Sequence, residues 1–113
     1  LDPNGLSRDP AVVQAYIADP LVHDRISSCL GAGLFEGGEW ALAHASEMRI
    51  PLLLMHGAAD PLTSSTASRE FAAASRNGCV LRIWDGLYHE IHNEPERAAV
   101  LDTACEWFAS RLA

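Results

Sequence analysis

The sequence predicts an α/β protein with two parallel strands and flanking helices. Two short apolar runs, residues 50–56 and 79–84, have the length and composition of buried strands. A helical pattern follows each run, so the order along the chain is strand, helix, strand, helix. This order is typical of parallel sheets, because parallel neighbours need a crossover connection and a helix supplies it.

The segment before the sheet is predicted to be helical and interrupted by glycine. Asp9-Pro10 is a helix-start signal, since the carboxylate accepts free amide protons and proline has no amide proton to leave unpaired. A helix is expected over 10–18, where apolar residues recur at helical spacing, and Asp19-Pro20 ends it. Residues 31–38 hold four of the eight glycines and are expected to form a loop or hinge before a second helix.

Local signals also mark the later helices. Thr63-Ser64-Ser65 can cap a helix that continues to Arg76, and Asn77-Gly78 stops it before the second strand. The last helix is expected to begin after Asn93 and to carry an apolar stripe along one side. The stripe consists of Val100, Leu101, Ala104, Trp107, Phe108 and Leu112.

Composition and charge exclude several classes of protein. The 113 residues are 49% apolar and 20% charged, which describes one globular domain at most. The 15 acidic residues against 8 basic ones give a net charge of −7, so nucleic acid is excluded as a partner, because phosphate binding needs concentrated positive charge. No apolar run approaches the roughly 18 residues that a membrane span needs, and no signal-peptide pattern opens the chain.

The cysteines and tryptophans are interpreted as core residues. Cys29, Cys79 and Cys105 are odd in number and unclustered, which favours small buried apolar side chains over disulfides or metal ligands. Trp40 and Trp107 are also expected in the core. Three free thiols indicate a reducing compartment, so we expect a cytoplasmic protein.

Two loops are the candidate functional sites. One is residues 56–61, directly after the first strand, and the other is residues 86–93, after the second. Loops past the carboxyl ends of parallel strands are where α/β proteins place function. Asp60 and His89 can face each other there, with the carboxylate holding the imidazole in one tautomer and stabilising its charged form. This is the orienting half of a nucleophilic triad.

Two motifs in and around these loops are residues 50–60, IPLLLMHGAAD, and residues 86–94, GLYHEIHNE. They resemble the C-terminal part of the monoacylglycerol lipase and lysophospholipase group of α/β-hydrolases. The resemblance implies a hydrolase of lipid or small esters, with Asp60 as the triad acid and His89 as the base. It implies neither a metal nor an organic cofactor.

The resemblance also divides the chain. It implies that residues 1–38 are the latter part of a helical cap with its hinge, and that residues 39–113 are the C-terminal part of the hydrolase core. Leu62, beside the acid, is expected to contact the acyl chain of the substrate or to pack in the core. The same two possibilities hold for the cap residues Ile17, Leu21 and Val22.

The nucleophile of such a triad is missing from the sequence. In these folds the serine lies in a G-x-S-x-G turn between a strand and a helix, and none of the nine serines has glycines two residues away on both sides. We therefore expect the C-terminal part of a serine ester hydrolase, inactive alone because loss of the nucleophile costs roughly a millionfold in turnover. The first residues, Leu1-Asp2-Pro3 without a Met, fit that expectation.

Simpler roles remain open for each candidate residue. Asp60 could be one more Asp-Pro helix cap, and His89 could be an ordinary loop histidine. His56 is expected to be a buried, hydrogen-bonded scaffold residue, and His92 either to support the site from behind or to lie at the surface. A metal site at His89 and His92 is a weaker alternative, because the zinc-protease motif needs histidines four apart and a third ligand.

A second hypothesis makes the chain a non-catalytic α/β module that self-associates. Two parallel strands leave both edges of the sheet unpaired, and a sheet of this size is not expected to be stable alone. Apolar surface would be exposed, which favours pairing. We therefore expect a homodimer or a larger homo-oligomer.

Overall fold

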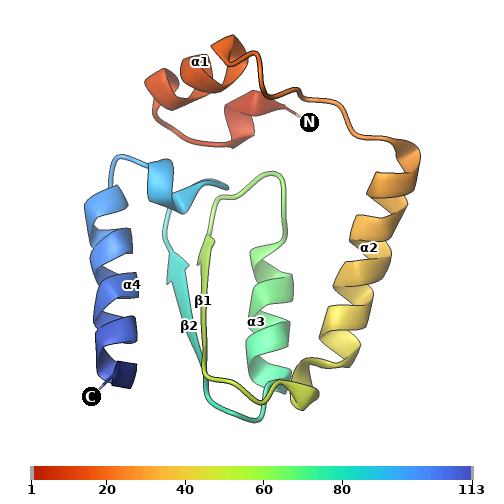
Figure 1. Ribbon diagram of the computed structural model, residues 1–113, viewed down its shortest axis with the longest axis vertical. Helices are drawn as coiled ribbons and strands as arrows, with labels where there is room; N and C mark the ends of the chain where they lie inside the picture. The colour runs from red at the N-terminus through yellow and green to blue at the C-terminus, as the bar shows by residue number, and fades with distance from the viewer. Residues whose placement is uncertain (1, 113) are drawn as a thin grey trace.

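The computed structural model describes residues 2–112, and it confirms an α/β fold with two parallel strands. Strand β1 (Leu52–Gly57) pairs with β2 (Cys79–Trp84), with Leu52 opposite Cys79 and Gly57 opposite Trp84. Helices α3 (Ser65–Ala74) and α4 (Arg97–Leu112) lie on either side of this sheet (Figure 1).

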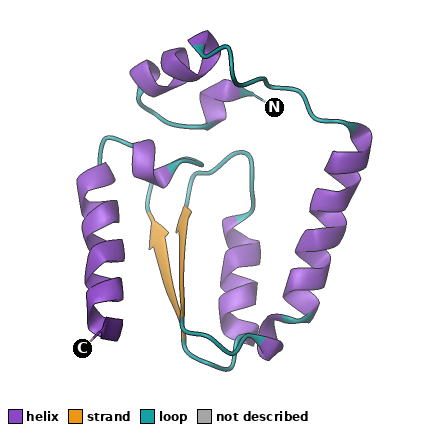
Figure 2. Cartoon of the chain, in the orientation of Figure 1, coloured by secondary structure: helices purple, strands orange, loops and turns teal. Residues whose placement is uncertain are grey.

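The remaining helices precede the sheet. They are η1 (Pro3–Gly5), α1 (Pro10–Ala18), α2 (Ser28–Ala43) and η2 (Ala45–Glu47), and a short helix η3 (Ile91–Asn93) lies between β2 and α4. Most of the chain is helical and the two strands form its centre (Figure 2). The N-terminal segment with α1 lies over the carboxyl ends of the strands (Figure 1).

The side chains of β1 alternate between the two faces of the sheet, and a different helix packs on each face. Leu54 lines a cavity together with Phe71 of α3, whereas Met55 packs against a buried cluster that includes Val100 of α4. Successive side chains of a strand point to opposite faces, so one face of β1 belongs to α3 and the other to α4. His56 lies on the α3 face, where its Nδ1 is 2.7 Å from Oγ of Ser68.

Side-chain caps begin the helices where the sequence predicts them. The Asp9 carboxylate accepts a hydrogen bond from the Ala11 amide at 2.9 Å, and α1 starts at the proline between them. Ser64 caps α3 by accepting from the Ala67 amide at 3.2 Å. The helices expected at 10–18 and after residues 63–65 are confirmed.

The loop or hinge expected over residues 31–38 is wrong, because this segment is part of helix α2. Ser27 caps the helix by accepting from the Leu30 amide at 3.1 Å, and α2 packs along α3. Each glycine destabilises a helix by about 1 kcal/mol relative to alanine. Capping and tertiary packing can outweigh this destabilisation. The second helix expected after residue 38 is the end of α2 followed by η2.

Several side chains assigned to the core from the sequence are exposed. Cys29 and Cys105 are exposed, Trp40 is 64% exposed, and of the stripe on α4 only Val100 is buried. They lie on faces of α2 and α4 that no other part of residues 2–112 covers. The other large exposed apolar side chains on these two helices are Leu30, Leu34, Phe35, Leu101, Phe108 and Leu112.

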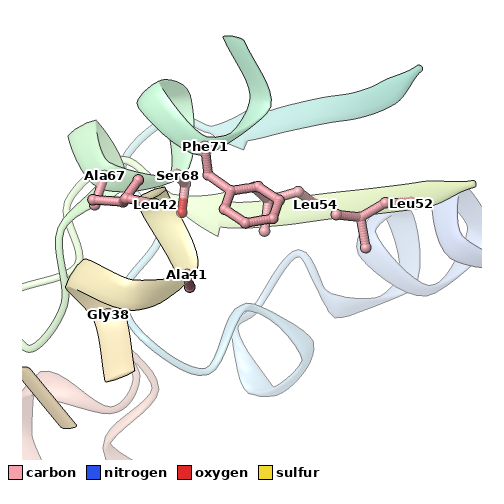
Figure 3. A pocket seen from close by; sticks show the side chains of 8 residues that line it. All are labelled: Gly38, Ala41, Leu42, Leu52, Leu54, Ala67, Ser68 and Phe71. Atoms are coloured by element: carbon pink, nitrogen blue, oxygen red, sulfur yellow. The ribbon is translucent and has the colours of Figure 1, made fainter. Parts of the chain in front are cut away.

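The packing between α2 and the sheet is also open. A cavity of about 300 Å³ lies between α2, β1 and α3, and apolar side chains such as Leu42, Leu54 and Phe71 line it (Figure 3). The radius of gyration is 15.6 Å, whereas a compact domain of this length has about 13 Å. The described residues therefore form a thin, extended arrangement with a small core. None of their helices is long and apolar enough to cross a bilayer.

Two glycine substitutions should have opposite effects on stability. A Cβ on Gly57 would lie 2.3 Å from the carbonyl oxygens of Leu87 and Tyr88, so Gly57→Ala should lower the free energy of unfolding by about 1–3 kcal/mol, as overpacking does. Nothing lies near a Cβ on Gly37, in the middle of α2, so Gly37→Ala should raise it by about 0.5–1 kcal/mol. Urea denaturation followed by circular dichroism measures both, and a stable Gly57→Ala protein would contradict the packing described.

Candidate active site

The two loops that follow the strands meet at the carboxyl edge of the sheet. After β1 the Ala58 amide donates to the Trp84 carbonyl at 2.8 Å, and the Ala59 amide donates to the Leu87 carbonyl at 3.0 Å. These bonds continue the strand pairing into the loops. They bring Asp60 and His89 together, with Asp60 Oδ2 2.9 Å from His89 Nδ1.

The Asp60 carboxylate is almost fully buried, with 2% of its side chain exposed, and it is densely hydrogen-bonded. Oδ1 accepts from the Leu62 and Thr63 amides at 2.8 and 3.1 Å, and Oδ2 accepts from the Thr63 hydroxyl at 2.6 Å. Burial raises the pKa of Asp60, but hydrogen bonds from Thr63, His89 and the Leu62 amide outweigh it and lower the pKa to about 2. Asp60 is therefore ionised at neutral pH.

An ionised carboxylate fixes the tautomer of His89. Asp60 can only accept hydrogen bonds, so Nδ1 of His89 carries the proton and Nε2 has a free lone pair. The side chain is 38% exposed, and Nε2 has no hydrogen-bond partner within residues 2–112. This imidazole can take a proton from a hydroxyl group and pass it on, while Asp60 stabilises its charged form.

His56 is a second histidine on the same carboxylate. Its Nε2 lies 3.0 Å from Asp60 Oδ2, and its Nδ1 lies 2.7 Å from the Ser68 hydroxyl. Nε2 is therefore the protonated nitrogen and Nδ1 accepts from Ser68. The side chain is 13% exposed and bonded at both nitrogens, as the expected scaffold role requires. The contact with Asp60 was not predicted, although a spacing of four residues across the turn after a strand is a signal for it.

The N-terminal segment lies against both loops, which the sequence did not indicate. The His89 amide donates to the Gly5 carbonyl at 3.4 Å, and the Glu90 amide donates to the Leu6 carbonyl at 2.8 Å. A Cβ on Gly5 would lie 2.8 Å from Cγ of Pro61, which follows Asp60. Gly5 is therefore enclosed between the loop that carries the acid and the loop that carries the histidine.

An apolar cavity of about 620 Å³ lies beside the acid, between the turn after Asp60 and the first half of α2. Leu62 lines it, as do Ile26, Gly31, Leu34, Phe35, Pro61, Thr63 and Ser64. Ile17 and Val22 line a different cavity, of about 320 Å³, and Leu21 is 89% exposed. Of the four residues considered for acyl contact, Leu62 is the one beside Asp60.

Within residues 2–112 no three His, Cys, Asp or Glu side chains lie close enough together to hold a metal ion. His92 lies in η3, is exposed, and precedes the start of α4. The two histidines of the alternative metal motif are therefore not on a common α-helix. That the protein uses no metal or cofactor stays a prediction.

A parallel α/β sheet with a buried carboxylate after one strand and a histidine after the next defines the class of the α/β-hydrolases. Residues 1–96 match the model of the family described as serine aminopeptidase, S33. This match covers most of the chain, and the protein belongs to that family.

Individual relatives agree with the family match. The chain is 39% identical to the monoacylglycerol lipase of Mycolicibacterium smegmatis, over 99% of this chain and 41% of that protein. It is 40% identical to phospholipase YtpA of Bacillus subtilis, over 89% of this chain and 42% of that protein. The crystal structure of Paleococcus ferrophilus monoacylglycerol lipase superimposes with a TM-score of 0.92 at 38% identity, covering 97% of this chain and 44% of that one. The chain thus spans about two fifths of the length of these relatives.

The low pKa of Asp60 should appear in the pH dependence of stability. A shift from 3.8 to about 2 stabilises the folded chain by about 2 kcal/mol at pH values above 4, and this contribution is lost as the pH falls from about 4 to 2. Asp60→Asn should therefore be less stable than the unaltered chain at pH 6, and the difference should shrink toward pH 2. Urea denaturation at intervals between pH 2 and pH 6 measures it, and a difference independent of pH would contradict the assignment.

Proposed function

We propose that this chain supplies the acid and the base of a serine ester hydrolase that acts on lipid monoesters. The observation that carries the proposal is the 2.9 Å contact between His89 Nδ1 and Asp60 Oδ2, made at the ends of two adjacent parallel strands. The relatives named monoacylglycerol lipase support the reaction class. Asp60 is the triad acid in this proposal and His89 is the base.

The reaction proceeds in two transfers through the free Nε2 of His89. A serine hydroxyl attacks the ester carbonyl, Nε2 takes the hydroxyl proton, and that proton passes to the leaving alcohol. Water then gives a proton to Nε2 and attacks the acyl-serine, and the proton returns to serine as the fatty acid leaves. Asp60 stabilises the imidazolium in both transfers.

The serine comes from outside these 113 residues, because the sequence contains no G-x-S-x-G turn. The donors that stabilise the tetrahedral oxyanion include the amide after that serine, so they are absent with it. We therefore propose that the chain has no hydrolytic activity alone.

The cavity beside Asp60 supports an acyl chain as the part of the substrate that binds there. Its lining is mainly apolar, and Leu62 connects it to the acid. Relatives named as a monoacylglycerol lipase and as a phospholipase support a single acyl ester with a polar head group. We place the latter part of a helical cap in residues 1–38 and the core in 39–113, with α2 continuous across that boundary. A cytoplasmic location accords with the three free cysteines.

A chimera tests the roles of the two residues. This chain would replace the matching 114 residues of the Mycolicibacterium smegmatis monoacylglycerol lipase, and hydrolysis of a monoacylglycerol would be measured. The chimera should be active, and His89→Ala should lower kcat at least about 10⁴-fold, because the members of a triad act as a unit.

His92→Ala is the matched control, since His92 lies three residues away, is exposed and has no contact with Asp60. It should leave kcat unchanged, and the 113-residue chain alone should show no hydrolysis. A folded chimera that is inactive, or one that keeps its activity after His89→Ala, would refute the proposal.

A second candidate is a non-catalytic module that self-associates. The exposed apolar faces of α2 and α4 support it, as does a radius of gyration of 15.6 Å. Large exposed apolar patches on a domain mark surfaces for association. In this case a second copy would cover Leu34, Phe35 and Trp40 on α2.

Light scattering coupled to size-exclusion chromatography distinguishes a monomeric chain from a self-associated one. At micromolar concentration the chain should elute as a dimer or a larger assembly, because burial of the apolar face of α2 favours association. Phe35→Glu, on the exposed face of α2, should shift the population toward the monomer. A mass of 12.2 kDa for the unaltered chain would contradict self-association.

A further inference from the structure

Glu94 is a charged side chain with no exposed surface, and the proposed reaction does not use it. It follows η3 and lies beneath the loop that carries His89. A carboxylate is costly to bury unless hydrogen-bond donors surround it. The groups that donate hydrogen bonds to Glu94 therefore show which parts of the chain it holds together.

Three N–H groups from two distant segments satisfy this carboxylate. Oε1 accepts from the Tyr88 amide at 2.8 Å and from the Arg8 amide at 3.2 Å, and Oε2 accepts from Nε of Arg8 at 2.9 Å. Arg8 also forms an ion pair with Glu96 through Nη2. Charge-assisted bonds of this kind are stronger than neutral ones, so Glu94 joins the N-terminal segment firmly to the histidine loop.

These contacts hold the backbone on both sides of His89 in place. Three successive amides are held, because Tyr88 donates to Glu94, His89 donates to the Gly5 carbonyl, and Glu90 donates to the Leu6 carbonyl. The segment that supplies those two carbonyls is itself held by Glu94 through Arg8. The one carboxylate thus fixes the first amide directly and the other two through the N-terminal segment.

We infer that Glu94, together with Arg8, is a positioning residue that sets the backbone of His89 so that its Nδ1 faces Asp60. Its catalytic meaning rests on the proposed function, whereas the positioning itself does not. A shift of the imidazole by about 1 Å is enough to lower turnover about 100-fold. Glu94 touches neither Asp60 nor the imidazole, so its influence passes through the peptide groups.

The test uses NMR of the 113-residue chain labelled uniformly with ¹⁵N. In the unaltered chain the Nδ1–H proton of His89, held by Asp60, should give a resolved resonance. Glu94→Gln keeps the size of the side chain but loses its charge, and it should abolish that resonance while the amide signals of β1 and β2 stay in place. Glu96→Gln is the matched control, because Glu96 also pairs with Arg8 but is half-exposed and does not contact the loop; it should leave the resonance unchanged.

The chimera adds a kinetic measurement. Glu94→Gln should lower kcat about 100-fold with little change in KM, because the substrate cavity is lined by other residues. An unchanged His89 resonance in folded Glu94→Gln would overturn the inference. If this variant does not fold, hydrogen exchange in the unaltered chain decides, since the amides of residues 88–90 should be protected together and rapid exchange at Tyr88 would overturn it. If His89→Ala keeps activity while Glu94→Gln loses the resonance, the positioning stands and the proposed function fails.

Discussion

The parallel pairing of β1 with β2 is the constraint on which the rest of the structure depends. Because the strands run in the same direction and end in register, with Gly57 opposite Trp84, their two following loops leave the sheet at one level. The loops then pass so closely that Gly57 has no room for a side-chain carbon beneath the Leu87 and Tyr88 carbonyls. The proximity of Asp60 to His89 follows from that register and needs no contact between the helices.

The hydrogen bonds to Asp60 then determine the charge at this site. Asp60 loses its water on burial, which favours the protonated form, yet the chain supplies hydrogen-bond donors to both of its oxygens. The donors outweigh the desolvation, so a charge is kept in a nearly closed site. His56 also contacts Oδ2 of Asp60, and its other ring nitrogen is hydrogen-bonded to Ser68 of α3. It therefore links the carboxylate to the helix that covers that face of the sheet.

Local patterns predicted the strands, the capped helices and the pair of loops that hold Asp60 and His89, because each depends on residues close in sequence. The α2 helix was missed because four glycines weaken the local helical signal, and capping and packing against α3 override it. The burial of Trp40 and Cys29 was wrong because periodicity shows which face is apolar but not whether anything covers it. Gly5, Arg8 and Glu94 carry no local pattern that predicts their contact, since it joins segments more than 80 residues apart in the sequence.

The bond between Arg8 and Glu94 joins residues 86 positions apart, and this separation has a consequence for folding. The entropy lost on closing a loop grows with its length, and contacts of high sequence separation form late because local structure does not bring them together. The paired residues of β1 and β2 are 27 positions apart, as for Leu52 and Cys79, so the contacts within β1, α3 and β2 can form first and build the sheet. The loop that carries His89 is fixed only when the segment with Arg8 packs against it, so we expect the geometry at His89 to form after the sheet.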